Sequence, residues 1–170
     1  DYETWLEYGL QSMHDKTLKR INRGHDYDCF LKAYEKAKNA GIKVCAHVIL
    51  GMWETHEEMM QTAKELARIG IDGVKLHQFS ALKGTELAKM YERGEIEFES
   101  EDEYVSLLCD FLEYLPKETT IHRLAGNGLV SENIAPLWLG KKWECLNKVD
   151  REFERRGTWQ GKKLIRGLEE

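Results

Sequence analysis

The sequence lacks the closely spaced cysteines from which a zinc or iron-sulfur site is built. It has four cysteines, and no two of them form a C-x-x-C pair. Because metal knuckles within one chain need such spacing, we assign no metal ligands in this chain. We expect the cysteines to be reduced thiols buried in the core, and they are Cys29, Cys45, Cys109 and Cys145.

Proline is also scarce, and long apolar runs are absent. A chain of 170 residues with 2 prolines and 42% hydrophobic residues is typical of a single domain with a real core, here residues 1–170. No run is long enough to cross a bilayer, and no leader is recognisable, so we expect a cytoplasmic protein without a membrane partner. Because the sequence opens at Asp1 rather than at a methionine, we expect that an upstream part of the natural protein is missing.

Positive charge is outnumbered by negative charge over most of the chain. The net charge of −5 gives no general attraction to nucleic acid or to anionic membranes. The segment between Gly140 and Arg166 is the exception, and it predicts either a contact with RNA or another polyanion, or a solvated helix face. The basic residues of this segment are Lys141, Lys142, Lys148, Arg151, Arg155, Arg156, Lys162, Lys163 and Arg166.

The chain does contain short apolar runs separated by amphipathic segments. The run 43–50, between two glycines, is typical of a buried strand, and further strands are predicted near 5–10, 73–79 and 119–124. Helices are predicted over 15–21, 27–40, 55–69, 84–93, 101–115 and 137–156. This order predicts an α/β fold, a parallel sheet with right-handed helical crossovers and a C-terminal helix. Because a closed eight-stranded barrel takes about 250 residues, the chain is an open sheet or part of a barrel.

One face of the predicted sheet is polar. Side chains alternate along a strand, so Glu7, His47, Lys75 and His77 fall on one face, although a parallel sheet covered by helices is apolar on both faces. Such groups are costly to bury unpaired. We interpret the face as the lining of a polar cavity. The alternative is a structural network in which Glu7 pairs with Lys75 and each histidine is hydrogen-bonded to a neighbour.

A further polar group follows the fourth predicted strand. His122 and Arg123 end that strand, and the glycine-rich segment 126–128 comes after it. This arrangement is compatible with recognition of a phosphate or a carboxylate, or with an ordinary turn.

Several short motifs occur together in a characteristic order. Taken as a set, they resemble radical S-adenosylmethionine (radical SAM) enzymes, and within that superfamily the YhcC-type group, which is related to the elongator and coproporphyrinogen dehydrogenase branches. The resemblance covers nearly the whole chain. Its motifs are Gly9-Leu-Gln-Ser12, Ile21-Asn-Arg-Gly-His25, His47-Val-Ile-Leu-Gly51, Gly73-Val-Lys-Leu-His77, Gly84-Thr-Glu-Leu-Ala88, His122-Arg-Leu124 and Ala135-Pro136.

The resemblance implies a partial barrel of the (β/α) type, of which this chain is the second half. It further implies that the full-length protein binds a [4Fe-4S] cluster and S-adenosylmethionine, and that it cleaves the latter reductively to a 5'-deoxyadenosyl radical that acts on an unknown small or macromolecular substrate. The three cysteines that hold the cluster in the family lie upstream of the residues present here. By this resemblance the chain is inactive alone.

The resemblance also implies roles for individual residues. Gln11 and Arg23 match positions that contact the methionyl carboxylate, and His47 matches a position that contacts the ribose. Gly51 and Glu54 match the adenine-side turn, which is one residue shorter here than the family's usual Gly-Leu-Pro-Gly-Glu and has no proline. The residues expected on the substrate side are Glu7, Lys75, His77, Gln78 and Arg123.

Two other functions remain compatible with the residues. The first is a metal-dependent barrel-like hydrolase that uses Glu7, His47 and His77. The second is a non-enzymatic module that binds RNA or protein through the basic C-terminal segment. For the oligomeric state we expect a homodimer, because half of a barrel leaves the edge of its first strand unpaired, and we expect Trp5 and Tyr8 near that interface.

Overall fold

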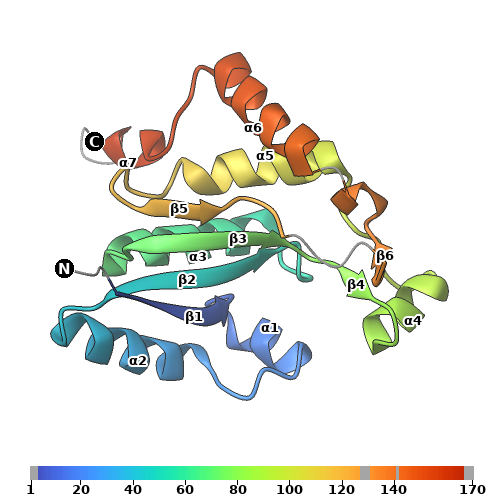
Figure 1. Cartoon of the computed structure of the whole chain (residues 1–170), viewed down its shortest axis with the longest axis horizontal. Helices are drawn as coiled ribbons and strands as arrows, with labels where there is room; N and C mark the ends of the chain where they lie inside the picture. The colour runs from blue at the N-terminus through green and yellow to red at the C-terminus, as the bar shows by residue number, and fades with distance from the viewer. Residues whose placement is uncertain (1–3, 127–130, 141, 167–170) are drawn as a thin grey trace.

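The computed structural model describes residues 4–126, 131–140 and 142–166, and a parallel sheet of four strands lies at its centre (Figure 1). The strands are β1 (Trp5–Gln11), β2 (Lys43–Leu50), β3 (Gly73–Gln78) and β5 (Thr120–Arg123), in the order β1-β2-β3-β5. All neighbouring pairs are parallel, which confirms the predicted α/β fold. The carboxyl ends of the strands therefore meet at one edge, where folds of this class bind ligands.

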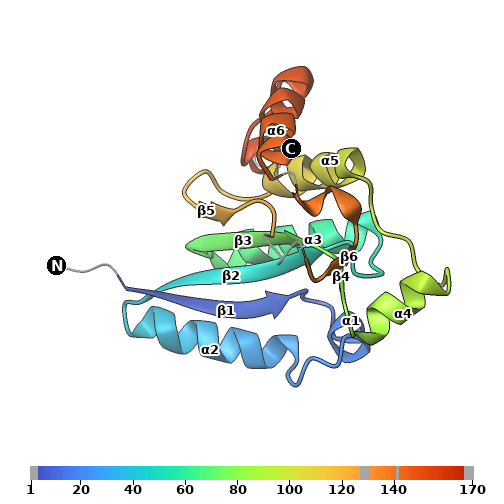
Figure 2. The ribbon, with the colours of Figure 1, turned by 45° about the vertical axis from the view of Figure 1, so that its right-hand side comes forward.

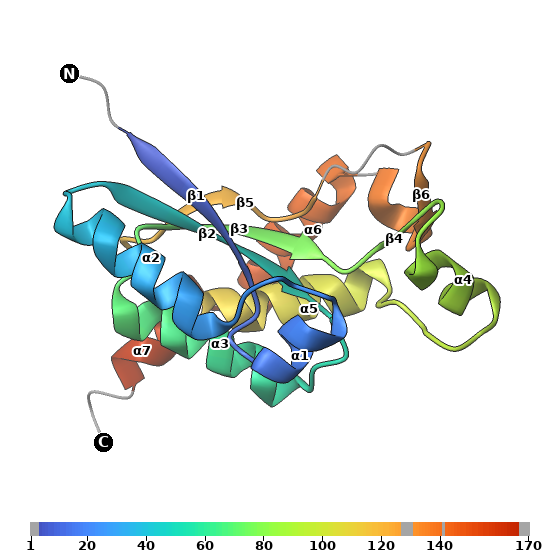
Figure 3. The same ribbon diagram turned by 90° about the horizontal axis from the view of Figure 1, so that it is seen from below.

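Helices cover one face of the sheet. Seen from below, α2 (Tyr27–Asn39), α3 (His56–Ile69) and α5 (Glu101–Leu112) lie on the same side of it (Figure 3). The short α1 (Asp15–Arg20) follows β1, and α6 (Lys142–Arg156) packs on α5 away from the sheet (Figure 2). The opposite face of the sheet carries the polar side chains.

The long helices begin at the caps that the sequence predicts. Thr55 starts α3 and Ser100 starts α5, each in a capping box with the glutamate three residues later. The side chain of Asp26 accepts a hydrogen bond of 2.9 Å from the backbone N–H of Cys29. Such caps satisfy N–H groups that the first helical turn leaves unpaired, and here they fix where each helix leaves the sheet.

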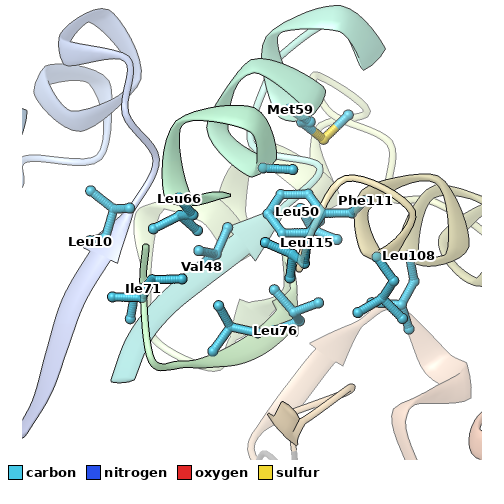
Figure 4. Close-up of a cluster of buried hydrophobic side chains, with 14 of the residues drawn as sticks. Leu10, Val48, Leu50, Met59, Leu66, Ile71, Leu76, Leu108, Phe111 and Leu115 are labelled. Carbon is cyan, nitrogen blue, oxygen red and sulfur yellow. The ribbon is translucent and has the colours of Figure 1, made fainter. Parts of the chain in front are cut away.

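The core fills the space between the sheet and the covering helices. The alternate residues of β2 and β3 that point to this side, such as Val48, Leu50 and Leu76, are almost fully buried. Figure 4 shows them packed against Met59 and Leu66 of α3 and against helix α5. This burial confirms the predicted apolar face of the sheet.

The prediction of one continuous helix over 137–156 is wrong. A 3-10 helix, η1 (Leu137–Gly140), precedes α6, so the helical phase changes between them. The spacing of the apolar residues predicts that one side of that helix is buried, formed by Leu139, Trp143, Leu146, Val149 and Phe153. Trp143 is instead 77% exposed, whereas Cys145 and Val149 are buried one turn apart. The apolar spacing continues across Gly140, where the 3-10 helix ends.

A few elements were not predicted at all. β4 (Ala81–Leu82) and β6 (Asn133–Ala135) pair antiparallel beside α4 (Glu86–Glu92) at the carboxyl end of the sheet, and α7 (Lys162–Arg166) follows α6. These strands are too short to show a periodicity. Cys29 was expected in the core but is exposed on α2. Within the described ranges, no helix has the length and apolar character that crossing a membrane requires.

Candidate functional site

The polar face is organised around the carboxylate of Glu7 on β1. Sheet register places Lys75 of β3 beside His47 of β2, and both reach Glu7. The ammonium of Lys75 donates to Oε1 of Glu7, and Nε2 of His47 lies 3.1 Å from Oε2. The hydrogen bond from Lys75 lowers the pKa of Glu7 and outweighs its partial desolvation, so Glu7 is ionised at neutral pH. Because an ionised carboxylate only accepts hydrogen bonds, Nε2 of His47 carries a proton.

His77 lies next to this network and has a different environment. Its ring stacks on that of His47 with centroids 5.8 Å apart. Burial, followed by the nearby charge of Arg123, lowers the pKa of His77 to about 4, so the ring is neutral at pH 7. Its Nε2 atom is buried and has no hydrogen-bond partner among the described residues. Such an unpaired atom is rare in folded proteins and marks a functional candidate.

The amino-end side of the polar face is closed by aromatic rings. Trp5 and His122 meet edge to face with centroids 4.5 Å apart, and both rings lie over Gly73, where a Cβ atom would come within 2.8 Å of each. Beyond them the register between β3 and β5 shifts, so that Val74 pairs with Ile121 but Lys75 pairs with Arg123. This irregularity brings Arg123 beside Lys75.

Arg23 and Gln11 come together at the carboxyl end of β1. Nη2 of Arg23 donates to the carbonyl of Gly9 at 2.7 Å, and its Nε lies 3.2 Å from Nε2 of His25. A Cβ atom on Gly9 would collide with the guanidinium and would lie 2.8 Å from Nε2 of Gln11. Gln11 has a positive φ of 70°. The absence of a side chain on Gly9 therefore creates the space in which the two donors converge.

The turn after β2 forms the next part of this edge. Gly51 has a φ of 91°, and the carboxylate of Glu99 fills the space where its Cβ would be. Burial raises the pKa of Glu99. Glu54 accepts a hydrogen bond from the hydroxyl of Ser12 at the end of β1, so Glu54 ties two neighbouring strand ends together. Ser12 and Glu99 are far from this turn in sequence, and no local pattern indicates either contact.

Gln78 was expected on the substrate side, and the structure gives it a contact within the protein. Its side chain is 6% exposed, and its Oε1 accepts a hydrogen bond of 2.8 Å from the backbone N–H of Gly126. This bond holds the loop after β5 against β3. Of the glycine-rich segment 126–128, residues 127 and 128 lie outside the described residues.

The structure gives the hydrolase alternative no support. Among the described residues there is no group of three or more His, Cys, Asp or Glu side chains that is able to hold a metal ion. The side chains of His47 and Glu7 are hydrogen-bonded to each other, and the ring of His77 stacks on the ring of His47.

Comparison with known proteins identifies the family. The model of the radical SAM C-terminal domain matches residues 71–155, and that of the radical SAM superfamily matches residues 1–74. The chain belongs to the radical SAM superfamily. This confirms the resemblance on which the residue assignments depend.

Relatives in the superfamily extend beyond this chain. YtqA of Bacillus subtilis is 44% identical over 167 residues, which are 98% of this chain and 52% of YtqA. YhcC of Escherichia coli is 37% identical over 97% of this chain and 53% of its own length. A tRNA uridine(34) acetyltransferase of Methanocaldococcus infernus is 31% identical over 71% of this chain and 23% of that protein. The chain thus spans about half the length of the first two relatives.

A solved structure also matches the fold. Elp3 of Methanocaldococcus infernus, with an N-terminal deletion, superimposes with a TM-score of 0.79 and 26% identity over 92% of this chain and 37% of that chain. The match supports the assignment of the open parallel sheet as a partial TIM-type barrel.

Radical SAM proteins in general use S-adenosylmethionine and a [4Fe-4S] cluster, and the described residues fit only one of these groups. They offer no set of cysteines for a cluster, because three of the four are buried and Cys29 is exposed on α2. They do offer hydrogen-bond donors whose chemistry suits a carboxylate such as that of S-adenosylmethionine. Arg23 and Gln11 supply a planar cation and an amide donor over Gly9, beside a shallow pocket of about 250 Å³.

Proposed function

We propose that this chain is the carboxyl-terminal part of a radical SAM enzyme, in which S-adenosylmethionine is cleaved reductively and the resulting 5'-deoxyadenosyl radical acts on a substrate. The observation that carries the proposal is the convergence of Arg23 and Gln11 over Gly9 in a chain of this superfamily. The cluster ligands belong to a part of the protein upstream of these residues.

Each residue of the carboxyl edge has a task in this proposal. Arg23 and Gln11 bind the methionyl carboxylate, and His47 contacts the ribose from the middle of the sheet. Gly51 shapes the adenine-side turn through its positive φ, and the carboxylate of Glu99 lies beside it where a side chain would stand. Glu54 fixes the position of this turn through Ser12. When bound, the cofactor and the reduced cluster supply the radical.

The polar face then belongs to the substrate side. It stands next to the carboxyl edge, uncovered by the helices, and it carries Glu7, Lys75, His77 and Arg123. Gln78 contributes indirectly, because its bond to Gly126 positions the loop that borders the face.

The binding of S-adenosylmethionine tests the proposal. In the full-length protein with its cluster, Arg23→Ala should weaken binding by about 1.5 to 3 kcal/mol, because a charge-assisted hydrogen bond is lost. Gly9→Ala should cause a similar loss by displacing the guanidinium, and the double variant should lose no more than either single one. Isothermal titration calorimetry measures all three, and Arg93→Ala, on the exposed end of α4, is the control.

Two results would contradict the proposal. An unchanged affinity in Arg23→Ala would remove this residue from the site. Submicromolar binding of S-adenosylmethionine to the 170-residue chain alone would show that no upstream cluster is needed.

A further inference from the structure

Hydrogen-bond donors outnumber acceptors on the polar face. The only carboxylate in the network is Glu7, and both of its oxygens are engaged, one by Lys75 and one by His47. The ammonium of Lys75 has three N–H groups, and within the described chain only the bond to Glu7 uses one of them. Its side chain is 17% exposed, so most of its aliphatic stem is buried, while the ammonium beside Glu7 is open to solvent and to a ligand. A face of this composition lacks an acceptor.

Arg123 adds a second cation at the same place. The shift of register between β3 and β5 puts Arg123, rather than His122, opposite Lys75. Irregularities of this kind redirect side chains and are common beside active sites. No ion pair or hydrogen bond joins the guanidinium to another side chain of the described residues, although it lies close enough to His77 to affect its ionisation.

The charges on the face do not cancel. His77 is held neutral by burial, and Glu7 offsets only one of the two permanent cations, Lys75 and Arg123. Two like charges side by side repel each other, and a partly desolvated cation without a partner is unfavourable. A purely structural network would supply a second carboxylate, which the described residues do not.

We propose that the substrate of this enzyme carries an anionic group, a carboxylate or a phosphate, that binds between Lys75 and Arg123. The inference rests on the proposed function, because that function makes the polar face the substrate side. The planar guanidinium of Arg123 suits bidentate binding of such a group. Glu7 is a positioning residue, which holds Lys75 against the sheet and at the same time limits the affinity for anions.

Anion binding to this chain provides the test. Inorganic phosphate and succinate are titrated separately into the ¹⁵N-labelled chain, and the Nε–Hε resonances of the arginines are followed by NMR. We expect saturable shifts of the Arg123 resonance with at least one of the two anions, and the stronger of them identifies the phosphate or the carboxylate as the preferred group. Shifts that rise linearly with both anions would overturn the inference.

Variants separate a specific site from general attraction. Lys75→Met should abolish saturation of the Arg123 resonance, and Arg123→Gln should abolish the matching shifts of the backbone amides around Lys75. Arg123→Lys, which keeps the charge and loses the fork geometry, should bind more weakly than the unchanged chain. Glu7→Gln should bind several-fold more tightly, because it removes the competing negative charge. Arg93→Gln, an exposed arginine paired with Glu86 and Glu95, is the matched control and should change nothing.

The outcomes for the inference and for the proposed function are separate. Circular dichroism establishes that each variant is folded, and a variant that does not fold is replaced by Arg123→Lys. Anion affinity that is unchanged in both Lys75→Met and Arg123→Lys would overturn the anion site, even if the full-length protein cleaves S-adenosylmethionine. Conversely, saturable anion binding with no cleavage in the cluster-loaded full-length protein would leave the anion site in place and refute the proposed function.

Discussion

Glu7 and His77 lie on the same polar face, and their surroundings lower the pKa of both. For Glu7 the cause is the hydrogen bond from Lys75, so the charged form is favoured. For His77 the cause is burial, so the neutral form is favoured. The result is a fixed pattern of charge at neutral pH, with ionised Glu7 and Lys75 beside an uncharged ring.

This pattern makes a prediction about His77→Leu. No hydrogen bond to Nε2 is lost in this variant, and an apolar side chain replaces a desolvated polar one. The free energy of unfolding in urea at pH 7 should therefore change by less than about 1 kcal/mol, or increase. His47→Leu is the comparison, and it should cost more because it removes a partner of Glu7. A loss above about 3 kcal/mol in His77→Leu would favour a dry network over a cavity.

The same variant should change the pH dependence of stability. The unfolded chain protonates His77 near pH 6.5, whereas the folded chain does so only near pH 4. The folded state therefore loses stability as pH falls from about 6.5 to about 4, and His77→Leu should flatten the curve in that window. The lowered pKa of Glu7 acts at more acidic pH, where its contribution is lost as pH falls through the folded-state value. Urea titrations from pH 7 to pH 4 measure the difference, and identical slopes would contradict the assignment.

At the residue scale the sequence predicted the polar face but not the contacts at the carboxyl edge beside it. Alternation along three strands was enough to place Glu7, His47, Lys75 and His77 on one face, because side-chain direction in a strand follows from position alone. The contacts of Glu99 with Gly51 and of Ser12 with Glu54 join residues far apart in the chain. They depend on how loops fold over the sheet edge, which no local spacing encodes.

At the scale of elements, the strands and most helices follow from periodicity and caps, whereas the start and the buried side of α6 do not. The apolar residues keep the spacing of one helix that begins at Leu137, but η1 changes the helical phase before α6 begins. β4 and β6 form only because the chain brings them together beside α4. Tertiary contacts, rather than local preference, decide these segments.

The phase of α6 leads to a prediction. Val149 is 2% exposed and packs toward α5, so Val149→Ala should lower the free energy of unfolding by about 2 kcal/mol. Trp143, although much larger, is 77% exposed, so Trp143→Gln should have almost no effect. Thermal or urea denaturation compares the two variants. A larger loss for Trp143→Gln would restore the phase expected from the sequence.

At the scale of the whole molecule, the basic C-terminal segment is less positive than its sequence indicates. Lys148 pairs with Glu101 and Asp102, Arg156 pairs with Asp110 and Glu152, and Lys163 pairs with Glu113. Lys141 and the side chains of Lys142 and Arg166 lie outside the described residues. These ion pairs tie α6 and α7 to α5 and leave fewer charges for a partner.

The predicted contact with RNA is therefore expected to be weak. Fluorescence anisotropy with a labelled single-stranded RNA should show little binding at about 150 mM salt, because few unpaired cations remain to release counterions. Arg151 lies on α6 and makes no side-chain hydrogen bond or ion pair with the described residues, so Arg151→Glu is the probe variant. Tight binding that falls steeply with salt and is lost in Arg151→Glu would instead support the RNA-binding alternative.

The open edge of the sheet leads to the last prediction. β1 pairs with β2 and, in the described part of the chain, has no strand on its other side, and a strand edge without a neighbouring strand is able to pair with one from another chain. We propose that two copies of this chain pair along this edge about a two-fold axis. Sedimentation equilibrium at micromolar concentration should then give twice the chain mass of 19.8 kDa.

Tyr8 packs against Phe30 with ring centroids 6.5 Å apart, so a charge placed there would disturb the fold as well as an interface. Hydrogen exchange of the backbone amides is the more specific probe. Dilution to the monomer should raise the exchange rates of the β1 amides and leave those of the β2 amides unchanged. A mass near 19.8 kDa would reject the dimer, and a dimer whose β1 exchange is indifferent to dilution would have its interface elsewhere.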